Sequence, residues 1–106
     1  MNANIDIQND ALIVFLSGEI DHHSAREIRE DIDLKIASSK PQAVELNFKD
    51  VSFMDSSGIG LIMGRYRLVS AYGGKIVISN VSSYLRRVMR LAGIDSIVEM
   101  KNEKEN

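Results

Sequence analysis

Two serine hydroxyls follow an aspartate at Asp55, Ser56 and Ser57, where an apolar run gives way to residues with helical spacing. At a helix start, the carboxylate or a hydroxyl accepts a hydrogen bond from the free N–H groups of the first turn. The same N–H groups and the helix dipole also favour a phosphate group. The triplet therefore predicts a helix cap, at which a serine of the first turn can be phosphorylated without melting the fold.

Other chemistries fit this region poorly. A hydrolase serine would stand in a G-x-S-x-G turn, which the sequence lacks. A receiver domain would place its acceptor aspartate after a strand, as Asp55 is, but it also needs an acidic pair and a late lysine that are missing. Gly58, Gly60 and Gly64 miss the dinucleotide spacing G-x-G-x-x-G by one residue and follow the third predicted strand. We therefore expect no enzyme activity and no cofactor.

The two histidines of the chain, His22 and His23, follow Asp21 in a segment predicted as a loop between a strand and a helix. Adjacent histidines do not readily bind one metal ion together, and no further ligands stand near them in the sequence. The chain has no cysteine, which excludes disulfides and thiolate sites. We expect no metal site here.

Two glycines stand inside the second predicted helix. Gly60 and Gly64 are four residues apart and so share one helix face. Each costs about 1 kcal/mol of helix stability relative to alanine. We interpret them as the mark of a close approach to that face, by the sheet or by a partner.

Apolar patterns predict the elements that hold these residues. Alternating or continuous apolar runs predict strands over residues 5–9, 11–18, 43–48, 75–80 and 94–100. The run at 11–18 is continuous enough for a strand covered on both faces. Helical spacing predicts helices over about 24–40, 56–72 and 82–92, the first capped by Ser24 with Glu27 three residues on. The expected inward faces of the second and third helices are Ile59, Ile62, Met63, Tyr66 and Val69, and Leu85, Val88, Met89 and Ala92.

The order β-β-α-β-α-β-α-β predicts an α/β fold, with a mostly parallel sheet, a leading antiparallel hairpin and packed helices. Its 106 residues suit one domain over 1–106, with a frayed polar tail from about 101 to 106. A net charge of -2 argues against direct nucleic-acid binding. No apolar run approaches the roughly 20 residues of a membrane span, and no signal peptide begins the chain. We expect a cytoplasmic protein, monomeric when free.

Two segments resemble one known family. Residues 17–25, SGEIDHHSA, and residues 46–66, LNFKDVSFMDSSGIGLIMGRY, are similar to the anti-sigma-factor antagonists of the STAS fold. The resemblance covers nearly the whole chain, and the DHH and FMDSSG details look most like the sporulation branch, which serves the first forespore sigma factor. Family members often continue past VEM, residues 98–100 here, into a short C-terminal helix, whereas the sequence given stops with KNEKEN.

The resemblance implies a phosphorylation switch. Its partner is an anti-sigma factor that is also a serine kinase with its own ATP or ADP. The unphosphorylated antagonist docks on that kinase and frees the sigma factor, whereas phosphorylation of Ser56 abolishes docking until a serine phosphatase resets it. The docking residues it implies are Asp21, His22, His23, Asp55, Ser57, Gly58, Ile59 and Gly60.

Two other functions remain open at the level of sequence. A STAS module in a stress-signalling or transport complex would share the fold and the place of the switch serine. A small nucleotide-binding or hydrolytic protein belongs to a different class. A direct nucleotide titration of the chain separates it from the antagonist and from the STAS module.

Overall fold

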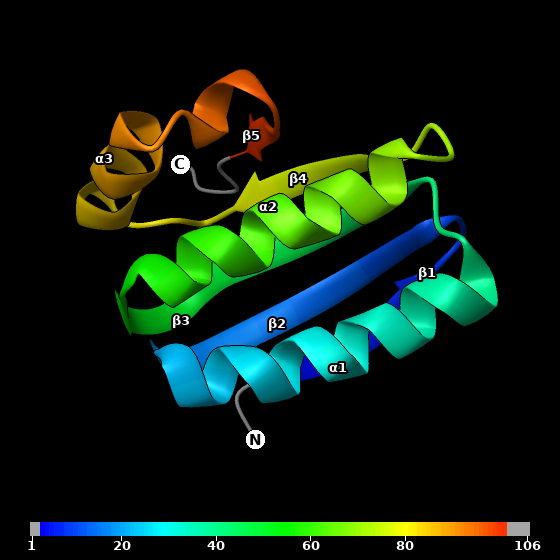
Figure 1. Ribbon diagram of the computed structural model, residues 1–106, viewed down its shortest axis with the longest axis horizontal. Coiled ribbons are helices and arrows are strands. Elements are labelled where there is room, and N and C mark those ends of the chain that lie inside the picture. Colours follow the sequence, from blue (N-terminus) through cyan, green and yellow to red (C-terminus); the bar gives the residue numbers. More distant parts are fainter. Residues whose placement is uncertain (1–2, 102–106) are drawn as a thin grey trace.

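Five strands form one mixed sheet in the computed structural model, which describes residues 3–101 (Figure 1). Their order across the sheet is their order in the chain. The first pair is antiparallel and the remaining pairs are parallel, which confirms the predicted hairpin and parallel sheet. The strands are β1 (Ala3–Gln8), β2 (Ala11–Ile20), β3 (Ala43–Met54), β4 (Lys75–Ser79) and β5 (Glu99–Lys101).

Two long helices lie side by side across one face of this sheet (Figure 1). They are α1 (His22–Ser39), which links β2 to β3, and α2 (Ser56–Ser70), which links β3 to β4. Because the parallel strands are added in one direction, right-handed crossovers place both helices on the same face. A shorter helix, α3 (Ser83–Leu91), and a 3-10 turn, η1 (Ile94–Ser96), connect β4 to β5.

The core lies between the sheet and these helices. On α1, Ala25, Ile28, Ile32 and Ile36 are buried, as their spacing predicts. On β2 the prediction of a strand covered on both faces is wrong, because burial alternates and Phe15 is exposed. The core residues of the central strands are Leu12, Val14, Leu16, Ile20, Val44, Leu46, Phe48, Val51, Met54, Ile76 and Ile78.

The first helix begins earlier than predicted. Asp21, not Ser24, is its N-cap, and the Asp21 carboxylate accepts hydrogen bonds from the backbone N–H groups of His23 and Ser24. The Ser24 hydroxyl accepts in return from the Asp21 N–H, at 3.0 Å, which completes a capping box one turn before the expected one. His22 and His23 therefore lie in the first turn of α1 and not in a loop.

The other predicted boundaries also move. β3 continues six residues beyond the expected Phe48, because its far end pairs with β2 past two register shifts. The last strand shrinks to Glu99–Lys101, since Ile94 begins a 3-10 turn instead. Lys101 therefore belongs to a strand, and the rest of the expected tail lies outside the described residues.

The inward faces of α2 and α3 differ from the prediction in part. Leu61 and Arg65 are buried on α2 together with Ile62 and Val69, while Ile59, Met63 and Tyr66 are only half-buried. On α3, Leu85 and Met89 are buried as expected and Val88 is half-buried. Ala92 is exposed, because the helix ends at Leu91 before it.

Candidate functional site

Two helix N-termini meet at the carboxyl edge of the parallel strands, at the left of Figure 1. β2 and β3 end at paired residues, Ile20 and Met54, and the next residue of each chain segment is an aspartate that caps a helix. The Asp55 N–H donates to the Ile20 carbonyl at 3.1 Å, which ties the two strand ends together. In open α/β sheets, ligands commonly bind outside the carboxyl ends of the strands.

At the start of α2, the Asp55 carboxylate caps the helix and the two serine hydroxyls do not. Asp55 has an extended backbone, and its carboxylate accepts from the Ser57 backbone N–H at 2.8 Å. This confirms the predicted cap and assigns it to the aspartate. Ser56 is exposed at the first helical position, and its hydroxyl makes no hydrogen bond with any residue in 3–101. Ser57 is half-buried one position later.

The neighbouring cap holds a fixed negative charge at the same edge. The hydrogen bond from the Ser24 backbone N–H is the main reason that the pKa of the Asp21 carboxyl lies below its ordinary value. The Ser24 hydroxyl and the His23 backbone N–H lower this pKa further, whereas desolvation raises it. Asp21 is therefore a carboxylate at neutral pH and places a negative charge at this edge of the sheet.

The glycines of α2 differ in what surrounds them. A Cβ at Gly58 would overlap the Met54 side chain, so this glycine serves close packing of the helix start on β3. A Cβ at Gly60 or Gly64 would meet nothing within 4 Å. The predicted close approach of the sheet to the face of Gly60 and Gly64 is therefore wrong, whereas an approach by a partner stays a prediction.

Alanine substitutions at these glycines should change the free energy of unfolding in opposite directions. We expect Gly64→Ala and Gly60→Ala each to raise the free energy of unfolding by up to about 1 kcal/mol, because alanine favours the helix and fits the open space. Gly58→Ala should lower it by about 1–3 kcal/mol, since buried Met54 must move. Urea unfolding measures all three, and a destabilising Gly64→Ala would contradict the open face.

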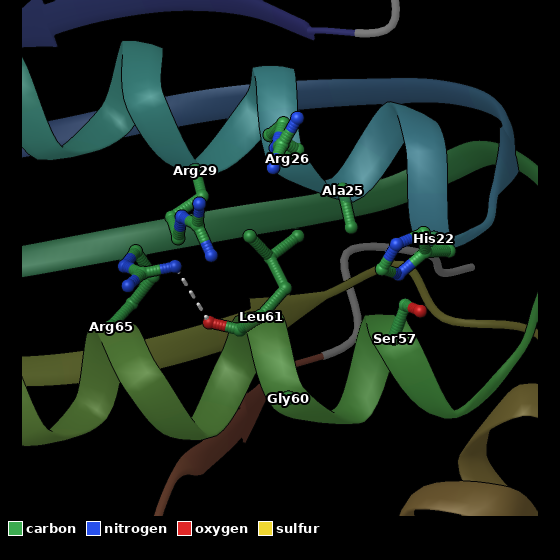
Figure 2. Close-up of a pocket in the computed structure, with 8 residues that line it drawn as sticks. All are labelled: His22, Ala25, Arg26, Arg29, Ser57, Gly60, Leu61 and Arg65. Carbon is green, nitrogen blue, oxygen red and sulfur yellow. Dashed lines mark hydrogen bonds between the residues drawn. The ribbon is translucent and has the colours of Figure 1, made fainter.

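The residues predicted as a docking surface differ in their exposure and in whether they line a pocket. His22, Ser57 and Gly60 line one pocket between α1 and α2, and Figure 2 shows the His22 ring directed toward the Ser57 side. His23 and Ser56 are exposed, and Ile59 is half-buried. Gly58 is buried against Met54, so we assign it a packing role.

Sequence reasoning missed the arginines of this pocket, which are Arg26, Arg29 and Arg65. A signal was available for two of them, because His22, Arg26 and Arg29 follow one another at spacings of four and three on one stripe of α1. Within residues 3–101, no three His, Cys, Asp or Glu side chains are grouped to hold a metal ion.

Comparison with known proteins gives one family. The family model for the STAS domain matches residues 2–106. The anti-sigma F factor antagonist of Paenibacillus polymyxa is 34% identical, over 100% of this chain and 92% of its own length. The anti-sigma-B factor antagonist of Bacillus subtilis (strain 168) is 36% identical, over 99% of this chain and 96% of its own.

Solved structures agree with these relatives. The anti-sigma factor antagonist SpoIIAA in its unphosphorylated form superimposes with a TM-score of 0.85 at 32% identity, over 97% of this chain and 89% of that one. The Bacillus cell fate determinant SpoIIAA in the phosphorylated form gives 0.79 at 32% identity, over 97% and 92%. In the part of this chain that the structure describes, no helix is long and apolar enough to cross a membrane.

Proposed function

This chain belongs to the STAS-domain family, and we propose that it is an anti-sigma factor antagonist that a serine phosphorylation switches off. Unphosphorylated, it docks on an anti-sigma factor and so releases a sigma factor for transcription. It acts by binding and is itself no enzyme. We treat residues 1–106 as one STAS domain acting in the cytoplasm, monomeric when free.

The observation that carries this proposal is that different residues provide the cap and the exposed hydroxyl at the start of α2. Asp55 caps the helix, while the hydroxyl of Ser56 is exposed and unbonded within the described chain. A phosphoryl group on Ser56 therefore displaces no hydrogen bond of the fold. It would also lie at the positive end of the helix dipole, where a negative charge is favourable. The site thus accepts phosphate without unfolding, as a switch requires.

The proposed docking surface surrounds this serine at the carboxyl edge of the sheet. It comprises Asp21, His22 and His23 at the start of α1 together with Asp55, Ser57, Ile59 and Gly60 at the start of α2. The charged Asp21 would pair with a basic residue of the anti-sigma factor. Electrostatic complementarity of this kind selects the partner and fixes the register of docking.

The proposed partners are two enzymes. The first is the anti-sigma factor itself, acting as a serine kinase with its own bound ATP or ADP, and the second is a phosphatase that removes the phosphate from Ser56. Relatives that antagonise anti-sigma F and anti-sigma-B factors are similar to this chain at 34% and 36% identity. We propose a sporulation sigma factor as the target and a stress-signalling module as the second candidate.

The docking experiment mixes the unphosphorylated chain with an anti-sigma F or an anti-sigma-B factor in the presence of ADP. We expect a saturable complex with one of them, measured by calorimetry. Asp21→Asn should weaken it about tenfold or more, because the amide still caps α1 but carries no charge for the basic partner residue.

Asp10→Asn is the matched control, since Asp10 lies in the turn before β2, at the opposite edge of the sheet. We expect its affinity to equal that of the native chain. Failure of the native chain to bind either anti-sigma factor, each shown to bind its own sigma factor, would overturn the proposed function. Binding that Asp21→Asn leaves unchanged would remove Asp21 from the docking surface alone.

A further inference from the structure

A cavity of about 330 Å³ opens between α1 and α2, next to the start of α2 (Figure 2). Pockets of this size are at the lower end of those that hold small ligands. Figure 2 shows side chains of both helices converging on it. Its lining residues are His22, Ala25, Arg26 and Arg29 from α1 and Ser57, Gly60, Leu61 and Arg65 from α2.

The charges around this cavity are unbalanced. Three guanidinium groups and a histidine line it, and no carboxylate does. Asp33, one turn beyond Arg29 on α1, balances one charge through an ion pair with Arg65 at 2.8 Å. The chain as a whole carries a formal charge of -2, so this is a local concentration of positive charge on an acidic protein.

Arg65 is the unusual member of the group, because it is only 5% exposed. Its Nη1 donates to the Leu61 carbonyl at 3.3 Å, and its Nε faces Asp33. No residue in 3–101 accepts a hydrogen bond from its Nη2, although a guanidinium has five N–H donors to satisfy. Burial chiefly lowers the pKa of Arg65, Asp33 opposes this, and the like charges of Arg29 and Arg67 lower it further. An anion would relieve both the desolvation and the repulsion.

The rest of the lining suits a compact anion. Gly60 leaves the wall open, since nothing lies within 4 Å of where its Cβ would be. Guanidinium groups bind phosphate through paired N–H donors, which a compact tetrahedral oxyanion accepts from several sides.

We propose that the cavity between α1 and α2 is a binding site for a phosphate group, carried by inorganic phosphate or by a small phosphate ester. Arg26 and Arg29 hold it from α1, and the buried Arg65 holds it from α2. Such a ligand bridges the two helices at a cavity that shares His22, Ser57 and Gly60 with the proposed docking surface. This site is separate from the phosphorylation of Ser56, which does not line the cavity.

The test titrates inorganic phosphate into the unphosphorylated chain at constant ionic strength, followed by amide and arginine Nε signals in NMR spectra. We expect saturable shifts at Ser57, Leu61 and Arg65. In the double variant Arg26→Gln/Arg29→Gln the dissociation constant should rise about tenfold or more, because charge-assisted hydrogen bonds are lost. Both arginines are exposed, so the variant should fold normally.

Arg86→Gln/Arg87→Gln on α3 removes the same charge away from the cavity and is the matched control, for which we expect an unchanged dissociation constant. Equal weakening in both double variants, or shifts that never saturate, would overturn the proposal. Glycerol phosphate separates the two sources: tighter binding than phosphate assigns an ester ligand, and exclusion assigns the free ion. No anti-sigma factor is needed, so this result is independent of the docking experiment.

Discussion

Phosphorylation of Ser56 is expected to weaken docking on the anti-sigma factor by about a hundredfold. A phosphoryl group adds roughly -1.5 to -2 charges at neutral pH. It would stand beside the carboxylate of Asp55 and at the same sheet edge as that of Asp21. Burying such a charge in an interface without a cationic partner costs several kcal/mol, and each 1.4 kcal/mol corresponds to a factor of ten in affinity.

The measurement has two stages. The chain is first incubated with the anti-sigma kinase and ATP, and intact mass with fragment mapping identifies the modified serine. Ser56→Ala should take up no phosphate, whereas Ser57→Ala, the neighbouring control, should take up one. The phosphorylated chain is then titrated with the anti-sigma factor in calorimetry.

Two results would change the scheme. Loss of phosphate only in Ser57→Ala would move the acceptor by one residue and keep the switch. No uptake by the native chain, with a kinase shown to be active on a control substrate, would leave a binding module without this switch.

Phe48→Ala is expected to lower the free energy of unfolding by about 3–5 kcal/mol. Phe48 is 2% exposed on the helix-covered face of β3, the strand that leads to Asp55. Removing its ring loses the transfer free energy of the buried atoms and leaves a cavity that the surrounding helices fill only in part. For a domain of this size the loss is a large fraction of the total stability.

The same strand offers a matched control. Phe53 is 43% exposed, so Phe53→Ala should cost about 1 kcal/mol or less. Urea unfolding of both variants gives the two free energies, with an unchanged dependence on denaturant expected for each. Equal losses would mean that the far end of β3 contributes to the core as much as its middle.

Much of the fold could be predicted because its signals are local. The spacing of Ile28, Ile32 and Ile36 reports one helix face without reference to any other element. The aspartate cap at Asp55 could also be predicted from the sequence, since a capping residue accepts from a backbone N–H only two residues away. The connection order then left few topologies for a mostly parallel sheet.

The errors arose where distant residues decide the outcome. Asp21 and Ser24 are both good capping residues. Asp21 caps α1 because β2 extends to Ile20, and β2 reaches that far because it pairs with β3 beyond two register shifts. The burial of Arg65 depends on Asp33 of another helix, so no pattern within α2 predicts that burial. The pocket was missed for the same reason, since its lining comes from both helices.

The separation of the Asp55 cap from the Ser56 hydroxyl has a consequence for protein turnover. Because phosphate on Ser56 breaks no hydrogen bond of the fold, both forms should unfold at similar rates and present the same chain to proteases. Degradation would then act alike on both forms, while the phosphorylated fraction changes. A cell could thus reverse the signal with a phosphatase alone, without synthesising new protein.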